Sequence, residues 1–309
     1  MKLVFFGTPD FAVPTLDALH DSSHEILGVV TSPDKRSGRG LKVKPSAIKI
    51  SAEKYGLPIY QPESTGSKQL NSILKQINPD IYVVVAYKIL PESILNIPHR
   101  GAINLHASLL PKYRGAAPVN HAILNGETET GLTTFMIQKK VDTGDLLLQQ
   151  SLQIDNSVTT GEALSKLSFI GADLIIKTLD ALAQNKIKPL KQDSAKATFA
   201  PKISVQDCKI NWTNPALVIH NQIRAFSPKP GAFTFYNKKR VKLFGSKVLQ
   251  NLQYPKLLPG EIEYTNSIFK IGTGSKPIQI TNIQIEGKKK LAVDKFILGF
   301  PKITGGCFD

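Results

Sequence analysis

Hydrophobic residues in the first 184 positions fall into short continuous runs that alternate with amphipathic stretches. The run at residues 81–86 reads Ile-Tyr-Val-Val-Val-Ala, and β-branched runs of this kind are typical of parallel strands buried on both faces. The expected strands are residues 3–6, 26–30, 81–86, 102–105, 131–137 and 145–152. The expected helices, from apolar side chains at helical spacing, are residues 11–19, 69–77 and 160–184. This order predicts an α/β domain with a doubly wound, mostly parallel, Rossmann-like sheet.

A different pattern begins after residue 184. Residues 185–206 are mostly polar and contain prolines, which indicates a linker. The later hydrophobic runs are short and alternate with polar residues, and the expected strands are residues 232–236, 240–243, 260–264, 267–271 and 278–285. Short strands separated by Gly and Pro turns predict a small β-barrel. The predicted organisation is therefore a domain at 1–184, a linker at 185–206 and a second domain at 207–309.

Charge distinguishes the two predicted domains. The 309-residue chain has a formal net charge of +15 at pH 7. Residues 1–200 contain 22 basic and 18 acidic residues, whereas residues 201–309 contain 17 and 6. This asymmetry favours a nucleic-acid partner for the second domain over an ordinary solvated surface.

Two further features concern the compartment. The two cysteines lie far apart in the sequence, so they predict no disulfide framework and indicate a reducing environment. No apolar run approaches the roughly 20 residues that span a bilayer. We therefore expect a soluble cytoplasmic protein without membrane association.

Two candidate catalytic residues lie at the end of the fourth expected strand, residues 102–105. Asn104 and His106 are two residues apart, so they point to the same side of the strand near its carboxyl end, where open α/β sheets bind ligands. An amide beside an imidazole suits stabilisation of an oxyanion and movement of a proton. A loop in which both side chains satisfy backbone groups explains this spacing equally well. Asp142, in a glycine-containing turn, would favour the imidazolium form of His106, although turn chemistry alone explains it better.

A basic segment follows the second expected strand. Five basic residues occur within ten positions, namely Lys35, Arg36, Arg39, Lys42 and Lys44. The segment has two glycines and no apolar periodicity, which predicts a mobile loop. Phosphate contact is favoured over a merely solvated loop because charge and flexibility combine there.

Several of these motifs together resemble the folate-dependent formyltransferases. Residues 104–111 read NLHASLLP, residues 113–118 read YRGAAP and residues 141–145 read VDTGD. The opening FGTPDFA and the GRG at residues 38–40 narrow the resemblance to the members that act on methionyl-tRNA. The strings RAFSP and PGA in the C-terminal half, at residues 224–228 and 230–232, match these members as well.

The resemblance implies transfer of a formyl group from 10-formyltetrahydrofolate to the α-amine of initiator methionyl-tRNA, with no metal. It makes Asn104, His106 and Asp142 the catalytic residues. It places the folate co-substrate against Ser108, Leu109, Leu110, Pro111, Tyr87 and Leu90. It assigns tRNA contact to the five basic residues named above, to Arg224 and Lys229, and to a C-terminal OB-like barrel. A monomer suffices for this reaction.

Two departures from the family pattern stand out. Lys88 lies in a shortened loop that is expected to line the pterin pocket, and Lys229 replaces an aromatic residue between two prolines. Three alternative functions remain. The first is formylation of a small amine, such as an amino sugar nucleotide or glycinamide ribonucleotide. The second is non-catalytic RNA binding, which the intact Asn104, His106 and Asp142 disfavour. The third is a dinucleotide oxidoreductase, which the missing glycine fingerprint disfavours.

Overall fold

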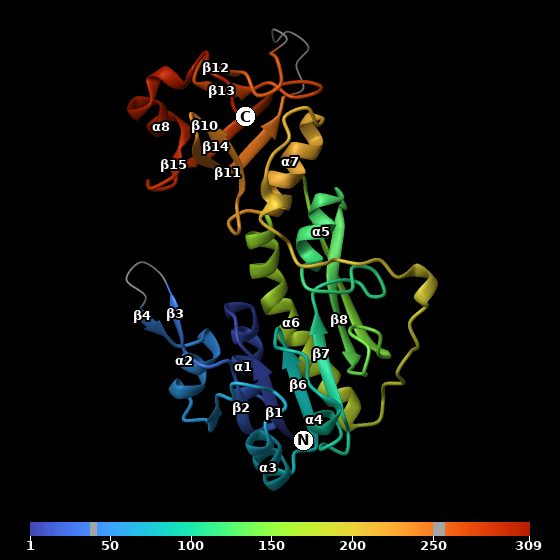
Figure 1. The fold of residues 1–309 in the computed structure, drawn as a ribbon. Coiled ribbons are helices and arrows are strands. Elements are labelled where there is room, and N and C mark those ends of the chain that lie inside the picture. The colour runs from blue at the N-terminus through green and yellow to red at the C-terminus, as the bar shows by residue number, and fades with distance from the viewer. Residues whose placement is uncertain (38–41, 250–256) are drawn as a thin grey trace. The chain divides into compact units, whose positions relative to one another are not determined.

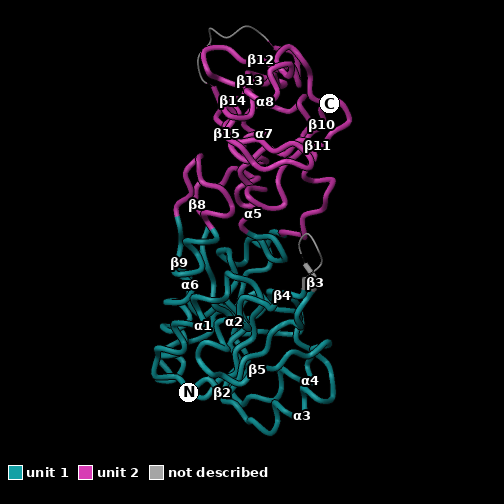
Figure 2. Tube along the Cα trace, turned by 90° about the vertical axis from the view of Figure 1, so that its left-hand side faces the viewer, with its two compact units in different colours: residues 1–118, 130–152, 164–199 teal, residues 119–129, 153–163, 200–309 magenta. Residues whose placement is uncertain are grey.

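A computed structural model describes residues 1–37, 42–249 and 257–309. The chain folds into two compact units (Figure 2). Unit 1 comprises residues 1–118, 130–152 and 164–199, and unit 2 comprises residues 119–129, 153–163 and 200–309. Residues 185–199 of the expected linker thus group with unit 1.

Unit 1 is built on a seven-stranded sheet with the order β5-β2-β1-β6-β7-β8-β9. Figure 1 labels five of these strands, namely β2, β1, β6, β7 and β8. The strands are β1 (Lys2–Gly7), β2 (Glu25–Val30), β5 (Ile59–Tyr60), β6 (Ile81–Val85), β7 (Ala102–His106), β8 (Glu129–Met136) and β9 (Leu146–Gln153). The first five strands run parallel to one another, and β8 pairs antiparallel with β7. The predicted doubly wound, mostly parallel sheet is confirmed.

Helices follow most of these strands. Those in the N-terminal 183 residues are α1 (Val13–His20), α2 (Ala47–Lys54), α3 (Lys68–Ile77), α4 (Glu92–Leu95), α5 (Pro118–Leu124) and α6 (Thr160–Ala183). Ser67 caps α3 by accepting a hydrogen bond from the amide of Leu70, which satisfies one of the free N–H groups at the helix start. Helix α6 packs on β7, where Gly171 leaves room for the side chain of Leu105. Among the described residues, no helix is long and apolar enough to cross a membrane.

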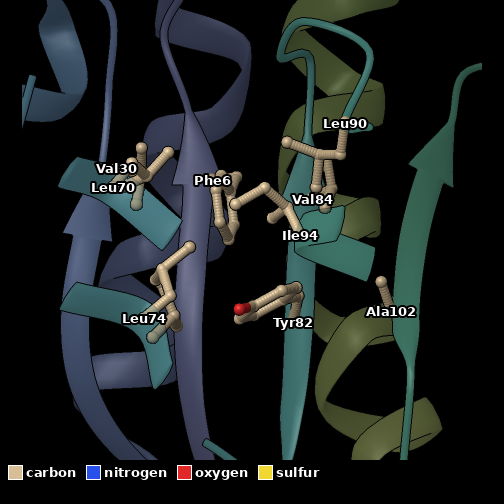
Figure 3. Close-up of a cluster of buried hydrophobic side chains, with 10 residues drawn as sticks. Phe6, Val30, Leu70, Leu74, Tyr82, Val84, Leu90, Ile94 and Ala102 are labelled. Carbon is tan, nitrogen blue, oxygen red and sulfur yellow. The ribbon is translucent and has the colours of Figure 1, made fainter. Parts of the chain in front are cut away.

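The apolar core on the opposite face of the sheet positions the site. Leu70 and Leu74 of α3 pack there against Phe6 of β1 and Tyr82 of β6 (Figure 3). Tyr82 pairs with Ala102, and Val84 pairs with Asn104, so the side chains of Asn104 and Val84 share this face. Burial of the Tyr82 hydroxyl raises its pKa far above the ordinary value. Asn104 is thus a polar residue at the end of an otherwise apolar surface.

Unit 2 contains a six-stranded antiparallel sheet. Its strands are β10 (Ala232–Tyr236), β11 (Lys239–Val248), β12 (Ile262–Thr265), β13 (Ile268–Ile271), β14 (Ile278–Ile285) and β15 (Leu291–Ala292), and its later helices are α7 (Ala216–Ala225) and α8 (Val293–Gly299). Irregular register around Gly245 bends β11 against β14, as bulges do in small barrels. The predicted small barrel-like domain is confirmed. Helix α7 was not predicted, although Ala216, Ile219 and Ile223 are spaced for one buried helical face.

The basic segment also differs from its prediction. Strands β3 (Lys35–Ser37) and β4 (Lys42–Lys44) pair as an antiparallel hairpin, where the sequence predicted a loop. A two-stranded ladder needs only paired backbone groups, so it forms without the apolar periodicity on which the prediction relied. Among the residues that the structure describes, short 3-10 helices lie at Asp10–Ala12, Ser194–Lys196, Gln206–Cys208 and Pro301–Ile303.

Candidate active site

Strand β7 carries the first two candidate residues. Asn104 lies between Val84 of β6 and Phe135 of β8, and His106 is the last residue of the strand. Residues two apart on a strand point to the same face, so both side chains emerge beside the apolar core at the carboxyl edge of the sheet. The Oδ1 atom of Asn104 is buried and has no hydrogen-bond partner among the described residues. A buried amide atom of this kind is costly unless a bound molecule satisfies it.

The imidazole of His106 is held through one nitrogen. Its Nε2 lies 2.9 Å from the carbonyl oxygen of Tyr113. A carbonyl only accepts hydrogen bonds, so Nε2 carries the proton. The other nitrogen, Nδ1, lies 3.7 Å from Oδ2 of Asp142, and the two side chains are each only 8 % exposed. Nδ1 is therefore the ring nitrogen that faces a buried carboxylate.

Asp142 is placed by the loop between β8 and β9. Its Oδ2 accepts a hydrogen bond of 2.8 Å from the amide of Gly115. Its φ of 54° lies in the left-handed region, which few residues other than glycine, Asn and Asp adopt. Two residues later, a Cβ on Gly144 would lie 1.6 Å from the carbonyl oxygen of Met136. The loop can therefore pass this close to β8 only with glycine at position 144.

The structure thus brings the three candidate catalytic residues to one edge of the sheet. The sequence also missed two of the groups that hold them, the carbonyl of Tyr113 and the amide of Gly115. Both are backbone groups, and reasoning from side-chain chemistry does not find them. Their presence in the YRGAAP motif was the available signal.

The candidate folate segment forms a turn with its own hydrogen bonds. The hydroxyl of Ser108 donates to the carbonyl of Lys112 at 2.6 Å, and the amide of Leu110 donates to the hydroxyl of Thr133 at 3.0 Å. Ser108 and Leu110 are buried, whereas Leu109 and Pro111 are partly exposed. The backbone shape of this turn and its two partly exposed side chains are therefore what it presents to a ligand.

Tyr87 and Leu90 lie against the apolar core of unit 1. Leu90 is buried within that cluster (Figure 3), and Tyr87 packs edge-on against the ring of Phe6. Burial raises the pKa of the Tyr87 phenol to about 12, and its hydroxyl has no hydrogen-bond partner among the described residues. These two residues extend the apolar core cluster of unit 1.

Most of the candidate tRNA-binding residues of unit 1 lie in the β3–β4 hairpin. Lys35 and Lys44 are exposed and lie opposite each other in the β3–β4 hairpin. Arg36 and Lys42 belong to the same strands, and Arg39 lies outside the described residues. Like charges that face each other across a ladder repel, so an anion bound there would relieve the repulsion.

The two candidate tRNA-binding residues in unit 2, Arg224 and Lys229, differ in their exposure to solvent. Lys229 is exposed, whereas Arg224 is 3 % exposed. The Arg224 guanidinium donates to Oδ1 of Asn221 and to the carbonyls of Asp155, Val158 and Ile123. Burial lowers the pKa of Arg224. This environment assigns Arg224 to the interior packing of unit 2 rather than to contact with tRNA, because its donors are directed at the protein's own backbone.

Comparisons with known proteins identify similar families and relatives. The formyl transferase family matches residues 1–179, and the C-terminal domain of formyl transferases matches residues 202–301. The chain is 40 % identical to a methionyl-tRNA formyltransferase of Moorella thermoacetica over 99 % of this chain and 100 % of that one. It is 42 % identical to a methionyl-tRNA formyltransferase of Caldanaerobacter subterraneus over 97 % of each chain.

A solved structure supports the fold. The N-formyltransferase from Helicobacter canadensis, in complex with folinic acid and dTDP-3-aminofucose, superposes with a TM-score of 0.69 at 22 % identity. The match covers 91 % of this chain and 98 % of that one. At this level of identity, the similarity concerns the arrangement of the elements.

Proposed function

The chain belongs to the formyl transferase family, and from this premise we propose that it transfers the formyl group of 10-formyltetrahydrofolate to the α-amine of methionyl initiator tRNA. The observation that carries the chemistry is the environment of His106. One ring nitrogen is fixed by the Tyr113 carbonyl and the other faces Asp142, on the strand that also carries Asn104. The substrates are proposed from the methionyl-tRNA formyltransferases that match over nearly the whole chain.

In the proposed reaction the amine attacks the formyl carbon, a C–N bond forms and negative charge develops on the formyl oxygen. The Asn104 amide and the Nδ1–H of protonated His106 donate hydrogen bonds to this oxygen. Fixed donors of this kind, aimed at developing charge in a site from which water is excluded, give the largest single contribution to many such reactions. Asp142 stabilises the imidazolium through the 3.7 Å approach of its Oδ2 to Nδ1.

Proton movement completes the proposed reaction. The attacking amine must lose a proton, and the nitrogen of folate that leaves must gain one. Asp142 lies beside Nδ1 of His106 and relays this proton to the folate nitrogen as the bond from that nitrogen to the formyl carbon breaks. Proton transfer by a positioned side chain contributes about 10²–10⁴-fold to the rate. Neither step needs a metal ion.

The basic surfaces supply the tRNA contacts in this proposal. Lys35, Arg36, Arg39, Lys42 and Lys44 would approach the acceptor end, and Lys229 with the basic surface of residues 207–309 would contact the backbone. Phosphate contacts of this kind position the substrate without reading its sequence. Residues 1–184 would carry the transfer chemistry, in a cytoplasmic enzyme that needs only one copy of the chain.

A competition between acceptors tests the proposal. Purified chain and 10-formyltetrahydrofolate are incubated with charged initiator tRNA, charged elongator tRNA or an amino sugar nucleotide, and formylated product is measured by mass. We expect formylation of the charged initiator tRNA. Formylation of the sugar amine alone would overturn the assignment of the substrate while leaving the assignment of the chemistry intact.

A further inference from the structure

Residues 192–198, which the sequence placed in a linker, contact both sides of the candidate active site within unit 1. We propose that Gln192 and Thr198 are positioning residues that hold the two groups facing the ring nitrogens of His106. Gln192 holds the loop of Asp142, and Thr198 holds the carbonyl of Tyr113. This inference rests on the proposed function and names two residues that its chemistry requires.

Both the nitrogen and the oxygen of the Gln192 side-chain amide form hydrogen bonds that hold the loop of Asp142. Its Nε2 donates to the carbonyl of Asp142 at 3.0 Å and to the carbonyl of Gly144 at 2.7 Å. Its Oε1 accepts from Nε and Nη2 of Arg114 at 3.2 and 2.7 Å. Arg114 is 7 % exposed, so its side chain is a fixed support. Both donors and the acceptor of Gln192 are therefore engaged, which leaves its amide a single orientation.

The hydrogen bonds from Gln192 hold the backbone of the Asp142 loop. Asp142 has a left-handed φ of 54°, which Asp tolerates better than most residues but adopts less readily than a right-handed φ. Gln192 donates hydrogen bonds to the carbonyls of Asp142 and Gly144, which lie on both sides of Thr143. With the backbone fixed in this way, Oδ2 of Asp142 reaches the amide of Gly115 and faces Nδ1 of His106. Without these two hydrogen bonds, the carboxylate of Asp142 would be free to move away from the imidazole of His106.

Thr198 influences Nε2 of His106 indirectly, by fixing the peptide group between Tyr113 and Arg114. Its carbonyl accepts from the amide of Arg114 at 2.9 Å, and its Oγ1 accepts from the amide of Tyr113 at 2.9 Å. The Arg114 amide and the Tyr113 carbonyl belong to one planar trans peptide, in which N–H and C=O point in opposite directions. Fixing the N–H therefore aims the carbonyl of Tyr113, which accepts from Nε2 of His106. Tyr113 has a left-handed φ of 59°, and the hydrogen bond from its amide to Oγ1 of Thr198 holds the residue in this unfavourable conformation.

The two residues together determine where the His106 protons lie. The Tyr113 carbonyl keeps a proton on Nε2, and Asp142 favours a proton on Nδ1 during the reaction. Both supports come from one segment, and they hold groups that are far from it in the sequence. A change at Gln192 should therefore disturb Asp142, and a change at Thr198 should disturb the tautomer of the ring.

Four variants separate positioning from general stability. Gln192→Met keeps the length of the side chain and removes its hydrogen bonds, and Thr198→Val removes the hydroxyl at constant shape. Thr198→Ser restores the hydroxyl and is the matched partner of Thr198→Val. Ser194→Ala, an exposed position in the same segment, is the control. We expect Gln192→Met to lower kcat about 10- to 100-fold, with both KM values within about twofold of wild type because it binds no substrate.

A double-mutant cycle tests whether Gln192 affects kcat through Asp142. In an Asp142→Ala background, Gln192→Met should lower kcat by less than about twofold, because residues that act through one another are not additive. An equal loss in both backgrounds, or a kcat of Gln192→Met near the wild-type value, would overturn the assignment of Gln192. The thermal midpoint of each variant is measured alongside, so that kcat is compared between folded proteins.

Nuclear magnetic resonance of the ring tests the geometry without turnover. In protein labelled with ¹⁵N-histidine, the wild type and Thr198→Ser should show the Nε2–H tautomer of neutral His106. Thr198→Val should show a measurable fraction of the Nδ1–H tautomer, and an unchanged spectrum would overturn the assignment of Thr198. A wild type that gives the expected spectrum and formylates no tRNA would instead contradict the proposed function.

Discussion

Nε2 of His106 donates to the carbonyl of Tyr113 at a distance of 2.9 Å, so the ring is anchored on the side away from Asp142. This contact leaves Nδ1 as the ring nitrogen that faces the carboxylate of Asp142. In the proposed reaction, Nδ1 is therefore the nitrogen that is directed at the substrate.

Removal of an oxyanion donor should slow the reaction without unfolding the protein. Asn104→Ala and His106→Ala should each lower turnover by about 10²–10³-fold. Steady-state formylation of charged tRNA measures the loss, and circular dichroism confirms the fold. Near-wild-type turnover of either folded variant would contradict the catalytic assignment.

Gly144→Ala should disrupt the loop that carries Asp142. The added Cβ would meet the carbonyl oxygen of Met136 at 1.6 Å, and neither backbone can retreat without breaking hydrogen bonds such as the one between the Met136 amide and the Asp145 carbonyl. We expect turnover to fall at least about tenfold, together with a lower thermal midpoint. Gly287→Ala serves as the control, because an added Cβ there meets no atom within 4 Å and bears only the strain of its positive φ.

Arg224 and Lys229 should affect different properties. Arg224→Met removes the hydrogen bonds of the buried guanidinium to Oδ1 of Asn221 and to three backbone carbonyls, so the free energy of unfolding should fall by about 2–3 kcal/mol. Lys229→Ala, at an exposed position, should change it by less than about 0.5 kcal/mol and should instead weaken tRNA binding. Chemical denaturation and filter binding measure the two effects. The assignment of Arg224 to the interior would be refuted if its replacement left stability intact.

Unit 2 should become less stable as the pH falls. His220 is 6 % exposed, and its Nε2 lies 2.6 Å from the carbonyl of Asn156 while its Nδ1 lies 2.9 Å from Oγ of Ser246. Burial, as the largest cause, and the charge of Arg224 lower the pKa of His220, against the hydrogen bond to Asn156. The folded state therefore binds this proton more weakly than the unfolded state does. The stability that neutral His220 contributes is complete above its ordinary pKa and is lost as pH falls through the lower, folded-state pKa.

The measurement is the free energy of unfolding as a function of pH between 7 and 5. The wild type should lose more stability over this range than His220→Gln does, since the variant has no group to titrate at this position. Equal slopes for the two proteins would show that His220 makes no contribution. The other histidines are the same in both proteins, so their titration largely cancels in the comparison.

Arg39→Ala should reduce the use of methionyl-tRNA far more than the use of a small amine acceptor. Arg39 lies outside the described residues, and its assignment rests on the charge of the hairpin to which Lys35 and Lys44 belong. Its loss should also reduce the dependence of tRNA affinity on salt, because fewer counterions are released on binding. Equal losses with both acceptors would place Arg39 in the chemistry or the fold.

Local patterns were sufficient for much of the fold. The apolar runs at β6 and β7 and the helical spacing of α6 identified these elements close to their observed bounds. Other elements were missed, such as α7 and the β3–β4 hairpin. The hairpin is held by backbone pairing between two charged segments, which leaves no hydrophobic period to detect.

The sequence by itself determined the order of the elements, the basic character of residues 201–309 and the identity of the three candidate catalytic side chains. The order of the elements and the charge depend on short-range spacing and on residue type, whereas the three side chains were assigned by the resemblance to the formyltransferases. Only the tertiary structure decided that Arg224 is buried, that Tyr113 and Gly115 present backbone groups to His106 and Asp142, and that Gln192 contacts the loop of Asp142. The contacts of Gly115 and Gln192 with Asp142 join residues 27 and 50 positions apart. Such pairs share no local period, and they meet only when the whole chain packs.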